Sequence, residues 1–173
     1  MHCYHISKYD PARAEHGSDY LAEQWTSVSD VGKVFGGRVV SEEEYLRVED
    51  AYLSCARHLA ERAGVESLLV RSLEVRADEP AFDLHDGAEL PLRTAIEVCR
   101  EMLREGTVWC RLHRPGVFYL HVGYDYHLYV GTSVESLDAA RRWAGDGVFV
   151  EAEWPSPYLD VESEEPDFVI DVP

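Results

Sequence analysis

Three consecutive runs in the second half of the chain show the alternation of apolar and polar residues that is typical of β-strands. They are residues 107–113 (TVWCRLH), 116–122 (GVFYLHV) and 124–130 (YDYHLYV). The first two runs meet at Arg-Pro-Gly and the last two at Gly123, and both junctions are typical of turns. Because only antiparallel strands can be joined by such short turns, the pattern predicts an antiparallel meander.

A helical pattern begins well before these runs. Ser41 and Glu44 form a capping box, in which each side chain covers a backbone amide that the first helical turn leaves without a partner. Apolar residues then recur at steps of three and four, and Gly64 supplies a stop. This spacing predicts an amphipathic helix that buries one stripe.

Two more helices are predicted further along the chain. One starts near Pro91, where a proline suits the first turn, and ends at Gly106. The other is predicted to open at a second capping box, formed by Thr132 and Glu135. Additional strands are predicted at residues 2–9, 67–75 and 147–154.

This order of elements predicts an α+β fold, with a mostly antiparallel sheet, a central meander and about three helices packed on it. A chain of 173 residues, 46% of them hydrophobic, suits one domain with an adequate core. We expect residues 1–157 to form this domain and residues 158–173 to form an acidic tail. The tail carries six carboxylates and no cation, so it could be solvated, or its FVIDV stretch could dock on the body.

The charge balance restricts the kind of partner. Sixteen basic residues against 33 acidic residues give a formal net charge of −17. Such a surface repels nucleic-acid phosphates and anionic lipids, so neither nucleic acid nor a membrane is expected to bind. The charge exceeds the magnitude of about 2–8 that solubility alone requires of a small domain. It therefore predicts a basic protein partner.

The remaining composition favours a cytoplasmic protein without a cofactor. The N-terminal residues lack the basic-then-apolar pattern of a secretory signal, and no segment is apolar for long enough to span a membrane. The four cysteines are far apart and no pair has CxxC spacing, which favours reduced core thiols over a metal site. No glycine-rich phosphate loop is present.

The run at residues 124–130 raises the question of catalysis. If it is a strand, alternation puts Asp125, His127 and Tyr129 on one face, and Tyr124 and Tyr126 on the core face. Asp125 and His127 could act as an orienting group and a base in a small hydrolase or transferase. No serine or cysteine stands in a recognisable nucleophile motif, however, so we expect a protein that is not an enzyme.

Several short stretches resemble a group of known proteins. The N-terminal CYHISKYDPA, then WTSVSDVGKVF, EEYLRVEDAYL and GYDYHLYVG, are similar to small bacterial immunity proteins of polymorphic or contact-dependent toxin systems. The resemblance implies a cytoplasmic inhibitor without enzymatic activity that binds its cognate toxin and blocks the toxin's active site. Such toxins are often nucleases with basic grooves, which an acidic inhibitor would complement.

These considerations predict a toxin-neutralising immunity protein with a basic toxin domain as its partner. The alternatives are the His/Asp-dependent enzyme and an acidic interaction module that is unrelated to toxins. Carboxylates in loops and on exposed faces would fill the toxin's cleft, with aromatic residues as buried anchors. The predicted partner-binding residues are Asp125, His127, Tyr129, Asp160, Glu162, Glu164 and Glu165.

Overall fold

The structure, a computed structural model, describes residues 1–14, 24–104 and 106–159. Its helices are α1 (Pro11–Ala14), the 3-10 turn η1 (Val28–Asp30), α3 (Glu42–Arg62), α4 (Leu92–Leu103) and α5 (Leu137–Ala144). Its strands are β1 (His2–Ser7), β2 (Val34–Phe35), β3 (Arg38–Val39), β4 (Ser67–Val75), β5 (Glu89–Pro91), β6 (Val108–Arg114), β7 (Phe118–Val122), β8 (Leu128–Thr132) and β9 (Phe149–Ala152).

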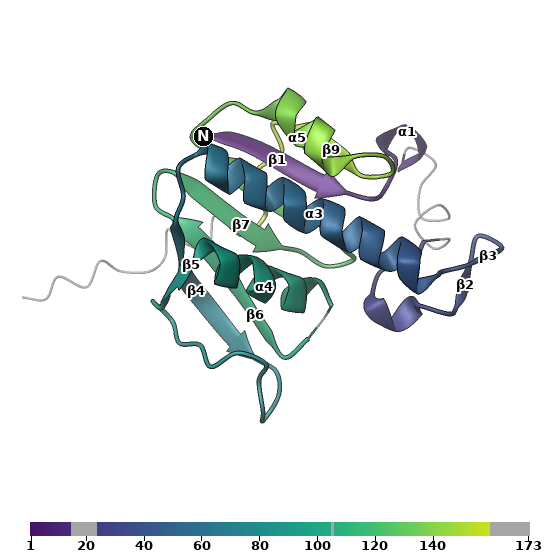
Figure 1. The fold of residues 1–173 in the computed structure, drawn as a ribbon, viewed down its shortest axis with the longest axis horizontal. Helices are drawn as coiled ribbons and strands as arrows, with labels where there is room; N and C mark the ends of the chain where they lie inside the picture. The colour runs from purple at the N-terminus through teal and green to yellow at the C-terminus, as the bar shows by residue number, and fades with distance from the viewer. Residues whose placement is uncertain (15–23, 105, 160–173) are drawn as a thin grey trace, which may run out of the picture.

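The described strands form one large sheet and a small hairpin. The seven-stranded sheet has the order β5-β4-β6-β7-β8-β1-β9, and every neighbouring pair is antiparallel. The predicted meander is therefore confirmed as β6-β7-β8. The first strand of the chain, β1, lies between β8 and β9, so the first and last strands are neighbours at one edge of the sheet (Figure 1).

Helices α3, α4 and α5 cover one face of this sheet, which confirms the predicted α+β class (Figure 1). The core lies between the two layers, where Tyr52 and Leu59 of α3 pack with Ile6 of β1 and Leu120 of β7. All four side chains are fully buried. No helix in the described part of the chain is long and apolar enough to cross a membrane.

The start of α3 matches its sequence signal. The Ser41 hydroxyl accepts a hydrogen bond from the Glu44 amide at 3.0 Å, which is the first half of the predicted capping box. At the other end, Gly64 adopts a φ of +71°, a conformation that favours glycine and ends the helix.

A buried ion cluster links α3 to α4. Glu49 is fully buried in α3, and its carboxylate accepts two hydrogen bonds from Arg104, at 2.6 and 2.7 Å. It also accepts one from Arg100 at 2.6 Å and one from the Tyr45 hydroxyl at 3.1 Å. A buried carboxylate needs this many donors because burial removes its hydration.

Two predicted boundaries are wrong. The strand expected to begin at Tyr124 begins at Leu128, because Asp125 and Tyr126 adopt left-handed φ values of 53° and 65°. Residues 123–127 form a turn instead, closed by a hydrogen bond of 2.8 Å from the Gly123 amide to the His127 carbonyl. The alternation of side chains between the two faces of a sheet does not continue through such a turn. Tyr124 is therefore 78% exposed, and only Tyr126 reaches the core.

The second wrong boundary is the start of α5. Thr132 is the last residue of β8, and the helix begins five residues later at Leu137, with Ser136 in the capping position. The Thr132 and Glu135 side chains instead accept hydrogen bonds from the amides of Val134 and Leu137, each two residues ahead. They stabilise a connecting loop, a common alternative for side chains of this kind.

Candidate binding site on the open face of the sheet

The face of the sheet opposite the helices carries a row of polar side chains. Cross-strand register places one residue from each of six strands in line: Glu151 of β9, His5 of β1, Tyr129 of β8, His121 of β7, Arg111 of β6 and Arg71 of β4. Neighbours of these residues along each strand, such as Ile6 and Leu120, face the helices instead. We call this side the open face.

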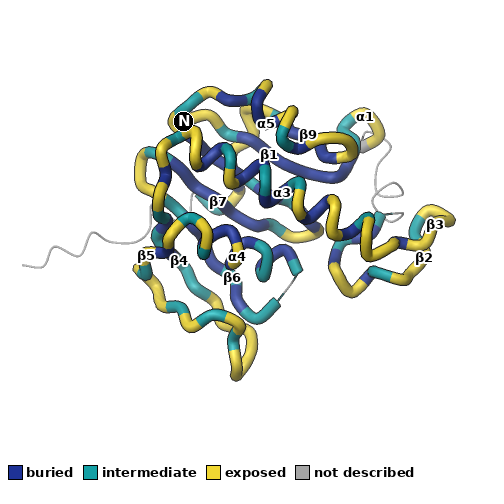
Figure 2. Tube along the Cα trace, in the orientation of Figure 1, coloured by how far each residue is buried: buried dark blue, intermediate teal, exposed yellow. Residues whose placement is uncertain are grey.

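The segment after β9 folds back over the open face. The Ser156 hydroxyl lies 2.8 Å from Nδ1 of His121, and the Ser156 amide donates to the Tyr119 hydroxyl at 3.3 Å. Tyr158 makes an edge-on ring contact with Trp109, and its carbonyl accepts a hydrogen bond of 3.0 Å from Arg111. This cover explains why β7 is buried along its whole length, as Figure 2 shows.

A chain of three titratable side chains runs along the edge of the open face. His5 Nδ1 lies 3.0 Å from a carboxylate oxygen of Glu151, and His5 Nε2 lies 2.7 Å from Nδ1 of His127. An ionised carboxylate only accepts hydrogen bonds, so the Nδ1–H of His5 donates to Glu151. Nε2 of neutral His5 must then accept from the Nδ1–H of His127. This fixes the tautomers of both rings and leaves the Nε2 lone pair of His127 as an acceptor.

Burial keeps these rings neutral. Desolvation first, and then the nearby His5, lower the pKa of His127 to about 4. Desolvation also lowers the pKa of His5, although the hydrogen bond that His5 donates to Glu151 opposes that shift. Both rings are therefore weak bases near neutral pH, which suits a hydrogen-bonded support better than a general base.

The structure also brings a serine and a histidine together, a pairing that can carry acyl-transfer chemistry. Here, however, His121 is fully buried and its pKa falls to about 3, first from desolvation and then from His113 and Arg111. Its Nε2 makes no hydrogen bond with any residue that the structure describes, and Ser156 is itself buried. The pair joins the C-terminal segment to β7.

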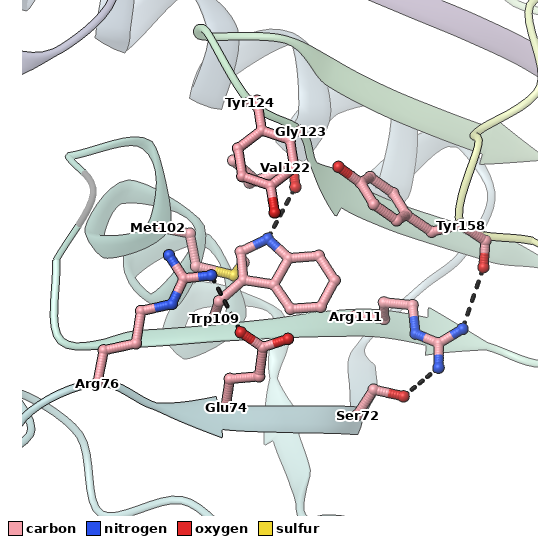
Figure 3. Close-up of a pocket in the computed structure, with 10 residues that line it drawn as sticks. All are labelled: Ser72, Glu74, Arg76, Met102, Trp109, Arg111, Val122, Gly123, Tyr124 and Tyr158. Carbon is pink, nitrogen blue, oxygen red and sulfur yellow. Dashed lines mark hydrogen bonds and ion pairs between the residues drawn. The ribbon is translucent and has the colours of Figure 1, made fainter. Parts of the chain in front are cut away.

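A cleft of about 480 Å³ opens beside this segment (Figure 3). Three aromatic rings line it: Trp109 from β6, Tyr124 from the turn after β7, and Tyr158 from the segment that covers the sheet. The indole N–H of Trp109 donates to the Val122 carbonyl at 2.9 Å, which holds that ring in place. The other lining residues are Ser72, Glu74, Arg76, Met102, Arg111, Val122 and Gly123.

Two of the charged side chains of the cleft, Glu74 and Arg76, lie near the end of β4 and just beyond it. Arg76 and Glu74 form an ion pair at 3.1 Å, and both side chains are more than 40% exposed, at 42% and 59%. Such an exposed pair contributes little to stability, so its charges are free to exchange partners. The cleft therefore combines three aromatic side chains with an exposed ion pair.

The residues predicted from the sequence are only partly brought together. Tyr129 stacks against His5 on the open face, and His127 joins the same cluster through its hydrogen bond to His5. Asp125 lies apart, on an exposed turn where its backbone carbonyl accepts a hydrogen bond of 2.5 Å from the Tyr9 hydroxyl. The hydrogen-bonding partner of His127 is thus His5, where the sequence suggested Asp125.

The four predicted tail residues, Asp160, Glu162, Glu164 and Glu165, lie outside the described residues. Reasoning from sequence missed Trp109, Tyr158 and the Glu151–His5 pair. Alternation within residues 107–113 does place Trp109, Arg111 and His113 on one face, a signal that could have identified the cleft wall. No group of three His, Cys, Asp or Glu side chains within the described ranges is arranged to hold a metal ion.

Fold and site together define a single α+β domain built on one antiparallel sheet. Helices cover one face of this sheet. The other face carries aromatic and arginine side chains and is partly covered by the segment that follows β9. No protein-family model, no curated protein and no solved structure matches the chain.

Proposed function

We propose that the protein is an immunity protein, a cytoplasmic inhibitor that binds a basic bacterial toxin domain and neutralises it. The observation that carries the proposal is the cleft on the open face, where a 78% exposed tyrosine, Tyr124, stands beside Trp109 and Tyr158. Tyrosine, tryptophan and arginine are the residues most enriched at the energetic centres of protein interfaces. A large exposed aromatic ring next to a preformed cleft is an anchor of this kind.

The charge supports a basic partner. A formal charge of −17 creates a field that attracts a cationic surface and accelerates its encounter with this protein. Asp125 adjoins Tyr124 on the exposed turn at the rim of the cleft, so a cation bound there would lie beside the aromatic anchor. Aromatic contacts would supply most of the affinity for the partner. The carboxylates would speed the association and favour basic partners over others.

The proposal includes a role for the predicted residues. His127 and Tyr129 support the turn that presents Tyr124, through contacts of both rings with His5. Asp160, Glu162, Glu164 and Glu165 contribute four of the negative charges that would attract a basic partner. The function requires no catalytic residue, because occupying the toxin's substrate groove is sufficient to inhibit it.

The test is a rescue experiment in the native genomic context. If a large secreted protein is encoded beside it, as the proposal expects, the protein is co-expressed with the C-terminal domain of that protein, and cell survival and complex formation are measured. We expect survival and a complex that weakens as salt is raised, because exposed charges are screened. Failure to rescue, together with no basic protein in a pull-down from the native cell, would contradict the proposal.

A point variant tests the cleft itself. We expect Tyr124→Ala to weaken the complex at least about tenfold, which corresponds to the loss of about 1.4 kcal/mol at an interface anchor. The matched control is Val34→Ala on the β2–β3 hairpin, where the side chain is also well exposed, at 64%, and does not line the cleft. Equal affinities for the two variants would remove the cleft from the interface.

A further inference from the structure

The cleft on the open face places a carboxylate next to its aromatic rings. Glu74 of β4 is directly opposite Trp109 of β6 in the strand register, so the carboxylate and the half-buried indole are neighbours on the same face. Figure 3 shows the indole at the centre of the cleft, between Glu74 and Tyr124, with Tyr158 to one side. Three rings and a carboxylate therefore line one cleft of about 480 Å³.

The rings of the cleft leave room for a flat group. Trp109 and Tyr158 meet edge to face, with their ring centroids 5.4 Å apart. Tyr124 makes no ring contact with either of them, or with any other residue that the structure describes. Since Tyr124 is also 78% exposed, most of its ring surface is open to a partner.

The electrostatics of the cleft favour a cation. The faces of aromatic rings carry negative potential and attract ammonium and guanidinium groups, most strongly at tryptophan. The formal charge of −17 draws cations to the protein and repels anions. Two cations of the protein also line the cleft, and both are engaged with neighbours. Arg76 forms the exposed ion pair with Glu74. Arg111 donates hydrogen bonds to the Tyr158 carbonyl and the Ser72 hydroxyl.

Among the cationic side chains of proteins, arginine suits this geometry best. Its guanidinium is flat, so one face can stack on an aromatic ring while the N–H groups at its edge still donate hydrogen bonds. A lysine ammonium is compact and strongly hydrated and has no flat surface to stack. At this site Trp109 offers the stacking surface and Glu74 offers the acceptor. The exposed pairing of Glu74 with Arg76 is weak enough to be exchanged for a pairing with an incoming arginine.

We infer that the cleft receives an arginine side chain of the basic partner, which stacks on Trp109 beside Tyr124 and pairs with the Glu74 carboxylate. The inference rests on the proposed function only for the identity of the partner, since the chemistry of the cleft is the same for an arginine on any chain. In the free protein, Arg76 takes the place of that arginine at Glu74. Binding exchanges one ion pair for another, so the net gain comes from the stacked rings.

The experiment uses N-acetyl-arginine amide as the probe, because its capped ends leave the guanidinium as its only charge. The probe is titrated into the full-length protein at low salt, and binding is followed by the NMR signal of the Trp109 indole N–H. We expect saturable binding, at least about fivefold tighter than that of the citrulline compound, which has the same shape without the charge. Equal binding of the two compounds, or no binding of the arginine compound, overturns the inference.

Three variants identify the groups that hold the probe. Tyr124→Leu and Glu74→Gln should each weaken binding of the arginine compound about threefold or more, since each removes one of its partners. Arg76→Gln should instead tighten binding about twofold, because Glu74 then has no internal competitor. Glu43→Gln, in the exposed first turn of α3, is the matched control and should have no effect. Weaker binding to Arg76→Gln than to the native protein would overturn the inference, because Arg76 would then be part of the site.

The probe also separates this inference from the proposed function, because it contains no toxin. If rescue succeeds and the arginine compound does not bind, the protein neutralises its toxin through other contacts and the inference is wrong. If the arginine compound binds as expected and rescue fails, the arginine site stands and the toxin is the wrong partner.

Discussion

His5 Nε2 lies 2.7 Å from His127 Nδ1, which joins β1 to the turn before β8 across a sequence separation of 122 residues. The Glu151 carboxylate of β9 holds the other nitrogen of His5, at 3.0 Å. The result is a polarised chain from a carboxylate through two neutral imidazoles to the edge of the turn that carries Tyr124. Its stability depends on both rings remaining neutral, because two protonated rings could not share this hydrogen bond.

This dependence predicts a loss of stability in mild acid. The pKa of His127 falls from 6.5 to about 4 on folding, so between those pH values the unfolded chain binds more protons than the folded protein. The contribution of His127 to stability is complete above pH 6.5 and disappears as the pH falls towards 4. We expect the free energy of unfolding, measured with urea, to decline across this window.

The variant His127→Asn isolates the contribution of this ring to the pH dependence of stability. Removing the ring should reduce the slope of stability against pH by up to about 1.4 kcal/mol per unit over this window. The matched control is His85→Asn, which makes the same substitution in an exposed loop. Identical slopes for the native protein and His127→Asn would contradict the buried, neutral state of this ring.

A second prediction concerns the ion cluster around Glu49. Glu49→Gln leaves Arg100 and Arg104 facing a buried neutral amide, and breaking a buried pair in this way costs about 3–5 kcal/mol. We expect the lower end of that range, because the two arginines are 29% and 37% exposed. Glu97→Gln, which removes an exposed partner of Arg100, should cost less than about 1 kcal/mol. Guanidinium unfolding of both variants distinguishes the two cases.

Gly131 provides a third test, on the packing of the open face. A Cβ atom at this position would overlap the ring of Tyr119, which lies on the glycine from the neighbouring strand β7. Gly131→Ala should therefore destabilise the protein by about 1–3 kcal/mol, as overpacking does. In a double-mutant cycle with Tyr119→Ala, the two costs should be less than additive, because the second change removes the overlap. Full additivity would show that the ring is not held there.

The anchor of the C-terminal segment gives a fourth test. Ser156→Ala leaves the buried His121 ring without its hydrogen-bonding partner at Nδ1, at a cost of about 1–3 kcal/mol. The same change should speed proteolysis after β9, since Tyr158 loses part of its attachment to the sheet. Ser133→Ala, at an exposed position, is the control and should change neither measurement. A stability equal to that of the native protein would show that the serine does not hold the segment.

Local patterns predicted the parts of the fold that depend on local chemistry. The Ser41 cap, the α3 stripe and the β6-β7-β8 meander follow from side-chain spacing and turn residues, and all three are confirmed. The α+β class follows from their order. The pattern failed at residues 124–127 because left-handed φ values at non-glycine residues leave no clear mark in a sequence.

The candidate site depended on the tertiary structure to a greater extent. Alternation identifies the side chains that share a face within one strand, and it correctly groups Trp109 with Arg111. It does not identify the neighbouring strand. The sequence alone determined an acidic α+β domain with a meander and a capped helix. Only the tertiary structure inserted β1 between β8 and β9, and so brought His5 to His127 and Glu151, because strand order depends on packing between segments that are far apart in the sequence.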